Sequence, residues 1–128
     1  MDDIKSLIPK HKADFERLDK NFDLGYSALK PILPELLEWI QDMDWSIAQK
    51  LAHFLLSIGI DIIPEIKRIM KIDDYIWQYA CLSEIVQKIG KDAIVLLEED
   101  LKRIRDNPKE EEKSEYLHGI AKKLLKMV

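Results

Sequence analysis

The sequence predicts an all-α fold made of about three helical hairpins behind an N-terminal helical cap. Apolar residues recur at helical spacing, and a pattern of about thirty residues repeats along the chain. Of the 128 residues, only 4 are glycine and 5 are proline, which favours long helices over a many-turned β-sandwich. With 47% hydrophobic and 34% charged residues, the composition indicates a folded, amphipathic chain.

The repeat becomes visible when the segment that starts at Pro34 is compared with the one that starts at Pro64. The first halves match at Pro34/Pro64, Glu35/Glu65, Leu36/Ile66, Ile40/Met70, Asp44/Asp74 and Trp45/Tyr75. The second halves match, one residue later, at Leu51/Leu82, Leu55/Val86, Ile58/Ile89 and Gly59/Gly90. This shift predicts an inserted residue near Trp77. A period of about thirty residues is the size of a two-helix unit. We therefore expect a single domain over 1–128, with a cap at 1–29 and hairpins at 30–60, 61–91 and 92–128.

Each expected helix carries one apolar face. In the first hairpin the two faces are Leu33, Leu36, Leu37 and Ile40, and then Ile47, Leu51, Phe54, Leu55 and Ile58. The second helix of the second hairpin has Leu82, Ile85, Val86 and Ile89. The third hairpin has Ile94, Leu97, Leu101 and Ile104, followed by Leu117, Ile120, Ala121 and Leu124. Spacings of three and four residues place each set on one side of a helix, where it can be buried.

Residues that begin and end helices stand at the expected boundaries. They are Pro34 and Pro64 in first turns, Asp44 and Asp74 as caps of second helices, and Gly59 and Gly90 after helix ends. In the third hairpin, the run Asn107-Pro108-Lys109-Glu110 predicts a helix that starts at Pro108 with Asn107 as its cap.

The run from Leu36 to Trp45, followed by Ala52 and Ile58-Gly59, resembles a HEAT repeat. This resemblance implies a right-handed α-α superhelix of HEAT-like hairpins. The chain departs from the HEAT pattern at Ala48 and Gln78, where that family usually has arginine. The run from Lys30 to Trp39 also resembles a bacterial family catalogued as a domain of unknown function, which implies an architecture and no activity.

Charge and cysteine content limit the possible environments and partners. A net charge of -4 argues against a general nucleic-acid binder, which normally carries a basic stripe. Cys81 is the single cysteine, so the chain forms no internal disulfide. The start Met1-Asp2-Asp3 is acidic and unlike a signal peptide, and no apolar run is long enough to span a bilayer. We expect a cytoplasmic protein without a membrane segment, as a monomer or weak dimer.

The chain offers no convincing catalytic or metal-binding set. The three histidines and Cys81 include no close pair, so we expect no metal and no cofactor. Cys81 is expected to be a buried, inert packing residue. The acidic runs Glu98-Glu99-Asp100 and Glu110-Glu111-Glu112 are interpreted as solvated helix starts. We assign no catalytic residues and expect a protein that is not an enzyme.

Aromatic side chains are the best indication of function. Trp45, Tyr75, Trp77 and Tyr79 gather at the starts of two second helices, which the HEAT resemblance places on the concave face. There they either anchor a partner or fill the gap beside the neighbouring hairpin. The candidate binding residues are Trp45, His53, Trp77 and Tyr79, and Trp77 is expected to turn outward at the predicted insertion.

Two functional classes compete on this evidence. We expect an interaction module that binds a protein or peptide partner through its second helices. The alternatives are a nucleic-acid repair or modification enzyme on a helical-repeat scaffold, or an immunity protein that blocks a toxin. A basic concave face with a recessed acid would favour the repair enzyme, whereas a neutral or acidic face with exposed aromatics would favour binding.

Overall fold

The computed structural model describes residues 30–43 and 46–128. Within these ranges the regular structure is helical, and no strand occurs. This confirms the all-α prediction. The predicted cap at 1–29 lies outside the described residues, as do Asp44 and Trp45. None of the described helices is both long and apolar enough to cross a bilayer.

The chain divides into two compact units, Met1–Ile58 and Gly59–Val128. The described part of unit 1 contains the 3-10 turn η2 (Lys30–Ile32), α3 (Leu33–Glu38), the 3-10 turn η3 (Trp39–Gln41) and α4 (Ser46–Leu56). The predicted face of the first helix is buried throughout: Leu33, Leu36, Leu37 and Ile40. In α4 the side chains of Ile47, Leu51 and Leu55 are buried, and so is Ala52.

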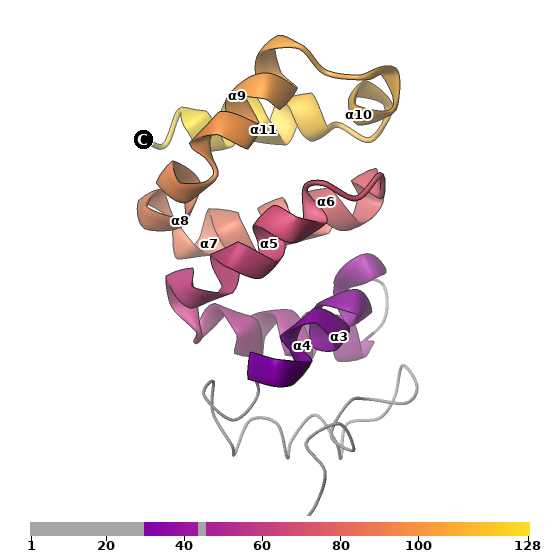
Figure 1. Cartoon of the computed structure of the whole chain (residues 1–128), viewed down its shortest axis with the longest axis vertical. Helices are drawn as coiled ribbons and strands as arrows, with labels where there is room; N and C mark the ends of the chain where they lie inside the picture. Colours follow the sequence, from indigo (N-terminus) through magenta and orange to yellow (C-terminus); the bar gives the residue numbers. More distant parts are fainter. Residues whose placement is uncertain (1–29, 44–45) are drawn as a thin grey trace, which may run out of the picture. The chain divides into compact units, whose positions relative to one another are not determined.

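Unit 2 holds most of the helices. It runs through the 3-10 turn η4 (Gly59–Ile62), α5 (Ile63–Ile69), α6 (Tyr75–Cys81), the π turn η5 (Leu82–Val86), α7 (Gln87–Ile89), α8 (Lys91–Leu96), α9 (Glu98–Asp106), α10 (Glu110–Ser114) and α11 (Leu117–Leu125). α9 and α11 lie side by side, and α6 contacts both α5 and α11 (Figure 1). Most residues of the predicted apolar faces are buried here too, among them Ile85, Ile94, Leu101, Ile120 and Leu124, whereas Ile89 is half-buried.

Several predicted helix ends are confirmed. Pro34 and Pro64 lie in the first turns of α3 and α5, and Asp74 caps α6. Gly59 and Gly90 both have positive φ, +73° and +100°. A side chain at either glycine would meet no atom within 4 Å, so the backbone conformation, not space, favours glycine at these ends.

The inserted residue predicted near Trp77 is not found there. α6 is regular at Trp77, and the irregularity in this stretch is η5, five to nine residues further on. A π turn holds one residue more than an α turn, so η5 is a place where an extra residue can be accommodated within a helix.

Two predicted helices of the third hairpin are each divided in two. The helix through Ile94 and Ile104 is interrupted at Leu97, whose φ of -107° and ψ of 9° separate α8 from α9. The last helix begins at Glu110 and not at Pro108, because Lys109 is the extended residue that precedes it. It is then interrupted at Tyr116, which has a left-handed φ of 63°.

Candidate functional site

Two polar side chains hold the turn between α5 and α6 in place: that of Gln78, on α6, and that of Asp74, which caps α6. The Gln78 side chain is buried, and its Nε2 donates hydrogen bonds to the carbonyl oxygens of Ile72 at 2.6 Å and Ile69 at 3.2 Å. The Asp74 carboxylate accepts a hydrogen bond of 3.1 Å from the backbone N–H of Trp77. Gln78 therefore has a structural role, because it holds the turn that leads into α6.

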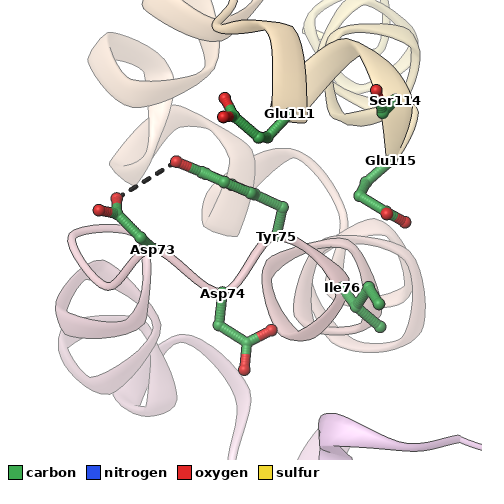
Figure 2. Close-up of a pocket in the computed structure, with 7 residues that line it drawn as sticks. All are labelled: Asp73, Asp74, Tyr75, Ile76, Glu111, Ser114 and Glu115. Atoms are coloured by element: carbon green, nitrogen blue, oxygen red, sulfur yellow. Dashed lines mark hydrogen bonds between the residues drawn. The ribbon is translucent and has the colours of Figure 1, made fainter.

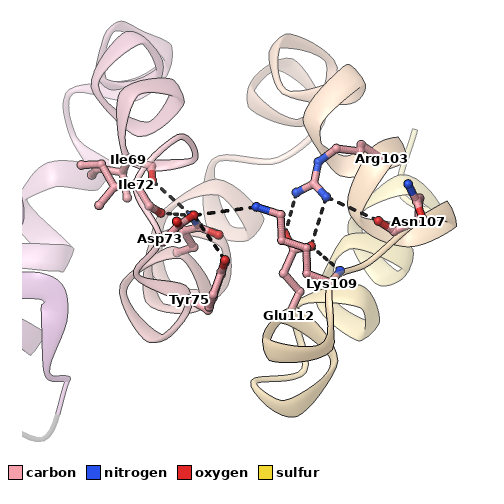
Figure 3. Close-up of polar contacts among 9 residues, drawn as sticks. Ile69, Ile72, Asp73, Tyr75, Arg103, Asn107, Lys109 and Glu112 are labelled. Carbon is pink, nitrogen blue, oxygen red and sulfur yellow. Dashed lines mark hydrogen bonds and ion pairs between the residues drawn. The ribbon is translucent and has the colours of Figure 1, made fainter.

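α10 is attached to α9 by a forked ion pair. Arg103 donates to both carboxylate oxygens of Glu112, over 3.0 Å and 2.6 Å, and the backbone N–H of Lys109 donates to the same carboxylate at 2.7 Å (Figure 3). The Glu112 side chain is only 1% exposed. The interpretation of Glu110-Glu111-Glu112 as a fully solvated helix start is therefore wrong for Glu112, which is a buried anchor.

The pKa values of the pair reflect this geometry. Burial is the largest single influence and raises the pKa of the Glu112 carboxyl. The hydrogen bonds from the Arg103 side chain and the Lys109 backbone, together with the positive charges of Arg103 and Lys109, lower it, and the pKa lies below its usual value. The hydrogen bond to Glu112 raises the pKa of Arg103. Both groups are thus charged across the physiological range, and the ion pair fixes the position of α10.

A pocket of about 320 Å³ lies between these two fixed segments (Figure 2). Its lining residues are Asp73, Asp74, Tyr75 and Ile76 from the α5–α6 turn and the start of α6, and Glu111, Ser114 and Glu115 from α10 and its end. All seven belong to unit 2, so the pocket does not depend on how the two units are arranged.

The pocket has a strongly acidic lining. Four of its seven lining side chains are carboxylates. The Tyr75 hydroxyl donates to Asp73 at 3.3 Å, and the Lys109 ammonium lies 3.8 Å from the same carboxylate (Figure 3). Desolvation and the nearby Asp73 charge raise the pKa of Tyr75, so the phenol stays neutral. With one lysine beside four carboxylates, the pocket is suited to a cationic group and repels anions.

The Ser114 side chain, which lines the pocket, is bonded to its own helix. The Ser114 hydroxyl donates back to the Glu110 carbonyl at 3.1 Å, so it is not paired with a general base. Among residues 30–43 and 46–128, no group of three or more His, Cys, Asp or Glu side chains could hold a metal ion.

Residues 7–125 match the family described as Domain of unknown function (DUF5071). The chain belongs to the DUF5071 family. The matched range includes the α5–α6 turn and α10, so the acidic pocket lies within the DUF5071 domain. No curated protein matches the chain.

The predicted binding residues have different environments in the DUF5071 domain. Trp45 lies outside the described residues, and His53 is exposed on α4 of unit 1. On α6, Tyr79 is 38% exposed but Trp77 is only 5% exposed. The expectation that Trp77 turns outward as a binding anchor is therefore wrong, because the regular α6 helix directs this large side chain inward.

The pocket residues were recognised only in part from the sequence. The sequence places Tyr75 in an aromatic set and Glu111 in an acidic run, and no sequence pattern links the two residues. One sequence feature could have indicated the pocket: an acidic run stands at the start of each of two expected helices. These runs are Asp73-Asp74 and Glu110 to Glu112. Helical periodicity does not reveal that these turns face one another.

Cys81 matches its predicted environment. Its side chain is buried, and burial, followed by the Asp74 charge, raises its pKa to about 12. The thiolate is therefore scarce at neutral pH, which argues against a nucleophilic role.

Proposed function

We propose that this DUF5071 protein is a non-enzymatic interaction module that binds a protein or peptide partner. The observation that carries the proposal is the acidic pocket between the α5–α6 turn and α10. A pocket with four carboxylates and an exposed apolar wall is suited to a basic segment that also presents apolar side chains.

The apolar part of the surface lies on α6. Ile76, which lines the pocket, is 58% exposed, and Tyr79 follows it at a spacing of three residues. Residues three apart lie on the same side of a helix, so Ile76 and Tyr79 form one apolar strip beside the pocket. Exposed aromatic and aliphatic side chains of this kind are common anchors in protein interfaces.

The acidic lining disfavours the alternative of a nucleic-acid enzyme. Phosphate groups would be repelled by Asp73, Asp74, Glu111 and Glu115, and nucleic-acid binding normally depends on lysine and arginine. An immunity protein that blocks a toxin is compatible with the same surface, since it would bind a basic patch of the toxin. It is one form of the proposed binding role.

We also propose the finer architecture, a right-handed superhelix of HEAT-like hairpins. Its support is the capped turn at Asp74 between α5 and α6, together with the positive φ of Gly59 and Gly90 at the ends of the two expected units. In this arrangement α6 is the second helix of its hairpin, and the second helices form the face that we propose for binding.

Affinity capture with matched variants tests the proposed function. The full chain, the double variant Glu111→Gln/Glu115→Gln and the control Glu99→Gln would each be used as bait in a lysate of the source organism. Glu99 is an exposed carboxylate on α9 outside the pocket. A partner that is retained by the wild type and the control but lost with the double variant is the expected result. A partner retained equally by all three baits would contradict binding through the pocket.

A further inference from the structure

We propose that the acidic pocket is a subsite for an arginine side chain of the partner, and that Lys109 is an internal competitor for it. This inference rests on the proposed function and specifies its chemistry. Two of the carboxylates flank the Tyr75 ring, Asp73 on the α5–α6 turn and Glu111 on α10 (Figure 2). Asp74 caps α6 and points away from Glu111, and Glu115 follows the end of α10. A guanidinium has five N–H donors spread over a plane and can bond to both sides at once, whereas an ammonium is a compact point charge.

Tyr75 adds a second feature that favours arginine. Figure 2 shows its ring lying across the pocket, with Asp73 beyond its hydroxyl and Glu111 nearby. The flat face of an aromatic ring attracts a guanidinium, which can stack on it. Because the Tyr75 hydroxyl donates to Asp73, the ring and the carboxylate are held together as one wall. Ile76 provides apolar surface for a neighbouring residue of the partner.

Lys109 shows that a cation already associates with this site. Its ammonium extends from the residue before α10 to Asp73 and lies 3.8 Å from the carboxylate (Figure 3). Both side chains are largely exposed, so the contact is weak and an incoming cation can displace it. The Lys109 backbone N–H donates to Glu112, and this hydrogen bond does not require the Lys109 side chain.

The test uses three acetylated and amidated pentapeptides, Gly-Leu-Xaa-Leu-Gly, in which Xaa is arginine, lysine or its neutral counterpart citrulline. Binding to the full chain is measured by titration at low ionic strength. The arginine peptide is expected to bind about fivefold more tightly than the lysine peptide. The citrulline peptide is expected to be the weakest, because it lacks the charge.

Variants then test the assigned residues. Lys109→Gln should tighten binding of the arginine peptide about two- to fivefold, and Glu111→Gln should weaken it by a similar factor. Lys102→Gln and Glu99→Gln are the matched controls on α9, and they should change nothing. Lys102 is also an exposed lysine in an ion pair, with Glu98 at 2.7 Å.

The outcomes separate this inference from the proposed function. Equal binding of the arginine and lysine peptides, or no effect of Lys109→Gln, would overturn the arginine subsite while leaving a general acidic binding surface. Failure of all three peptides to bind would also overturn it. The proposed function is tested separately, by whether the Glu111→Gln/Glu115→Gln variant loses the partner that the wild type captures.

Discussion

Trp77 and Tyr79 are two residues apart on α6, yet their side chains have different surroundings. Trp77 is 5% exposed and Tyr79 is 38% exposed. Trp77→Ala should therefore lower the free energy of unfolding by about 3–5 kcal/mol, because it leaves a large cavity. Tyr79→Ala should change it by about 0.5 kcal/mol or less. Chemical denaturation of both variants checks the prediction. Similar losses for the two variants would contradict the inward orientation of Trp77.

Cys81 provides a second test at the residue scale. Because its thiol is buried and its pKa is raised to about 12, a thiol reagent should label the native protein slowly at neutral pH. The same reagent should label the denatured protein at once. Rapid labelling of the native protein, with a pH midpoint near the ordinary value, would show that Cys81 is accessible and reactive.

At the scale of elements, the attachment of α10 depends on Glu112. Its carboxylate accepts hydrogen bonds from Arg103 and from the Lys109 backbone, and it is buried. Glu112→Gln should therefore destabilise the protein at neutral pH by about 2 kcal/mol, the typical value for hydrogen bonds to a charged group. The partly exposed Arg103 can return to water in the variant, so the larger cost of an isolated buried charge is not expected.

The same residue predicts a pH dependence. The pKa of Glu112 is lower in the folded protein than its ordinary value of 4.5. Its stabilising contribution is therefore complete above about pH 4.5 and is lost as the pH falls through the lowered pKa. Thermal denaturation from pH 7 to pH 3 should show a smaller loss of stability for Glu112→Gln than for the wild type. Glu111→Gln, the same change at the exposed neighbouring position, is the control. Parallel pH profiles for Glu112→Gln and the wild type would contradict the prediction.

The helices show which features of the fold a sequence can predict. Apolar spacing identified the buried faces, from Leu33 in α3 to Leu124 in α11, because burial follows helical periodicity directly. The breaks at Leu97 and Tyr116 were missed. Leu97 is apolar and buried like Ile94 and Leu101 on the same face, and Tyr116 adopts a left-handed φ that is usually reserved for glycine. Neither residue type indicates that a helix ends there.

At the scale of the whole molecule, the pocket depends on contacts that are distant in the sequence. The Asp74 cap was predictable from local spacing, whereas Tyr75 and Glu111 are 36 residues apart and meet through tertiary packing. The buried fork between Arg103 and Glu112 was not predicted either, since an acidic run at a helix start usually remains in water. The sequence therefore predicted the scaffold better than the site.

Mapping where a ligand binds on the protein tests the central proposal, binding at the acidic pocket, most directly. In the amide NMR spectrum of isotope-labelled protein, titration with the arginine pentapeptide should shift the resonances of residues 73–76 and 111–115, which form the two sides of the pocket. Resonances of the exposed apolar residues Val95 and Leu96 on α8 should stay in place, because they are not part of the pocket. Shifts confined to α8, with residues 73–76 and 111–115 unchanged, would contradict the acidic pocket as the binding surface.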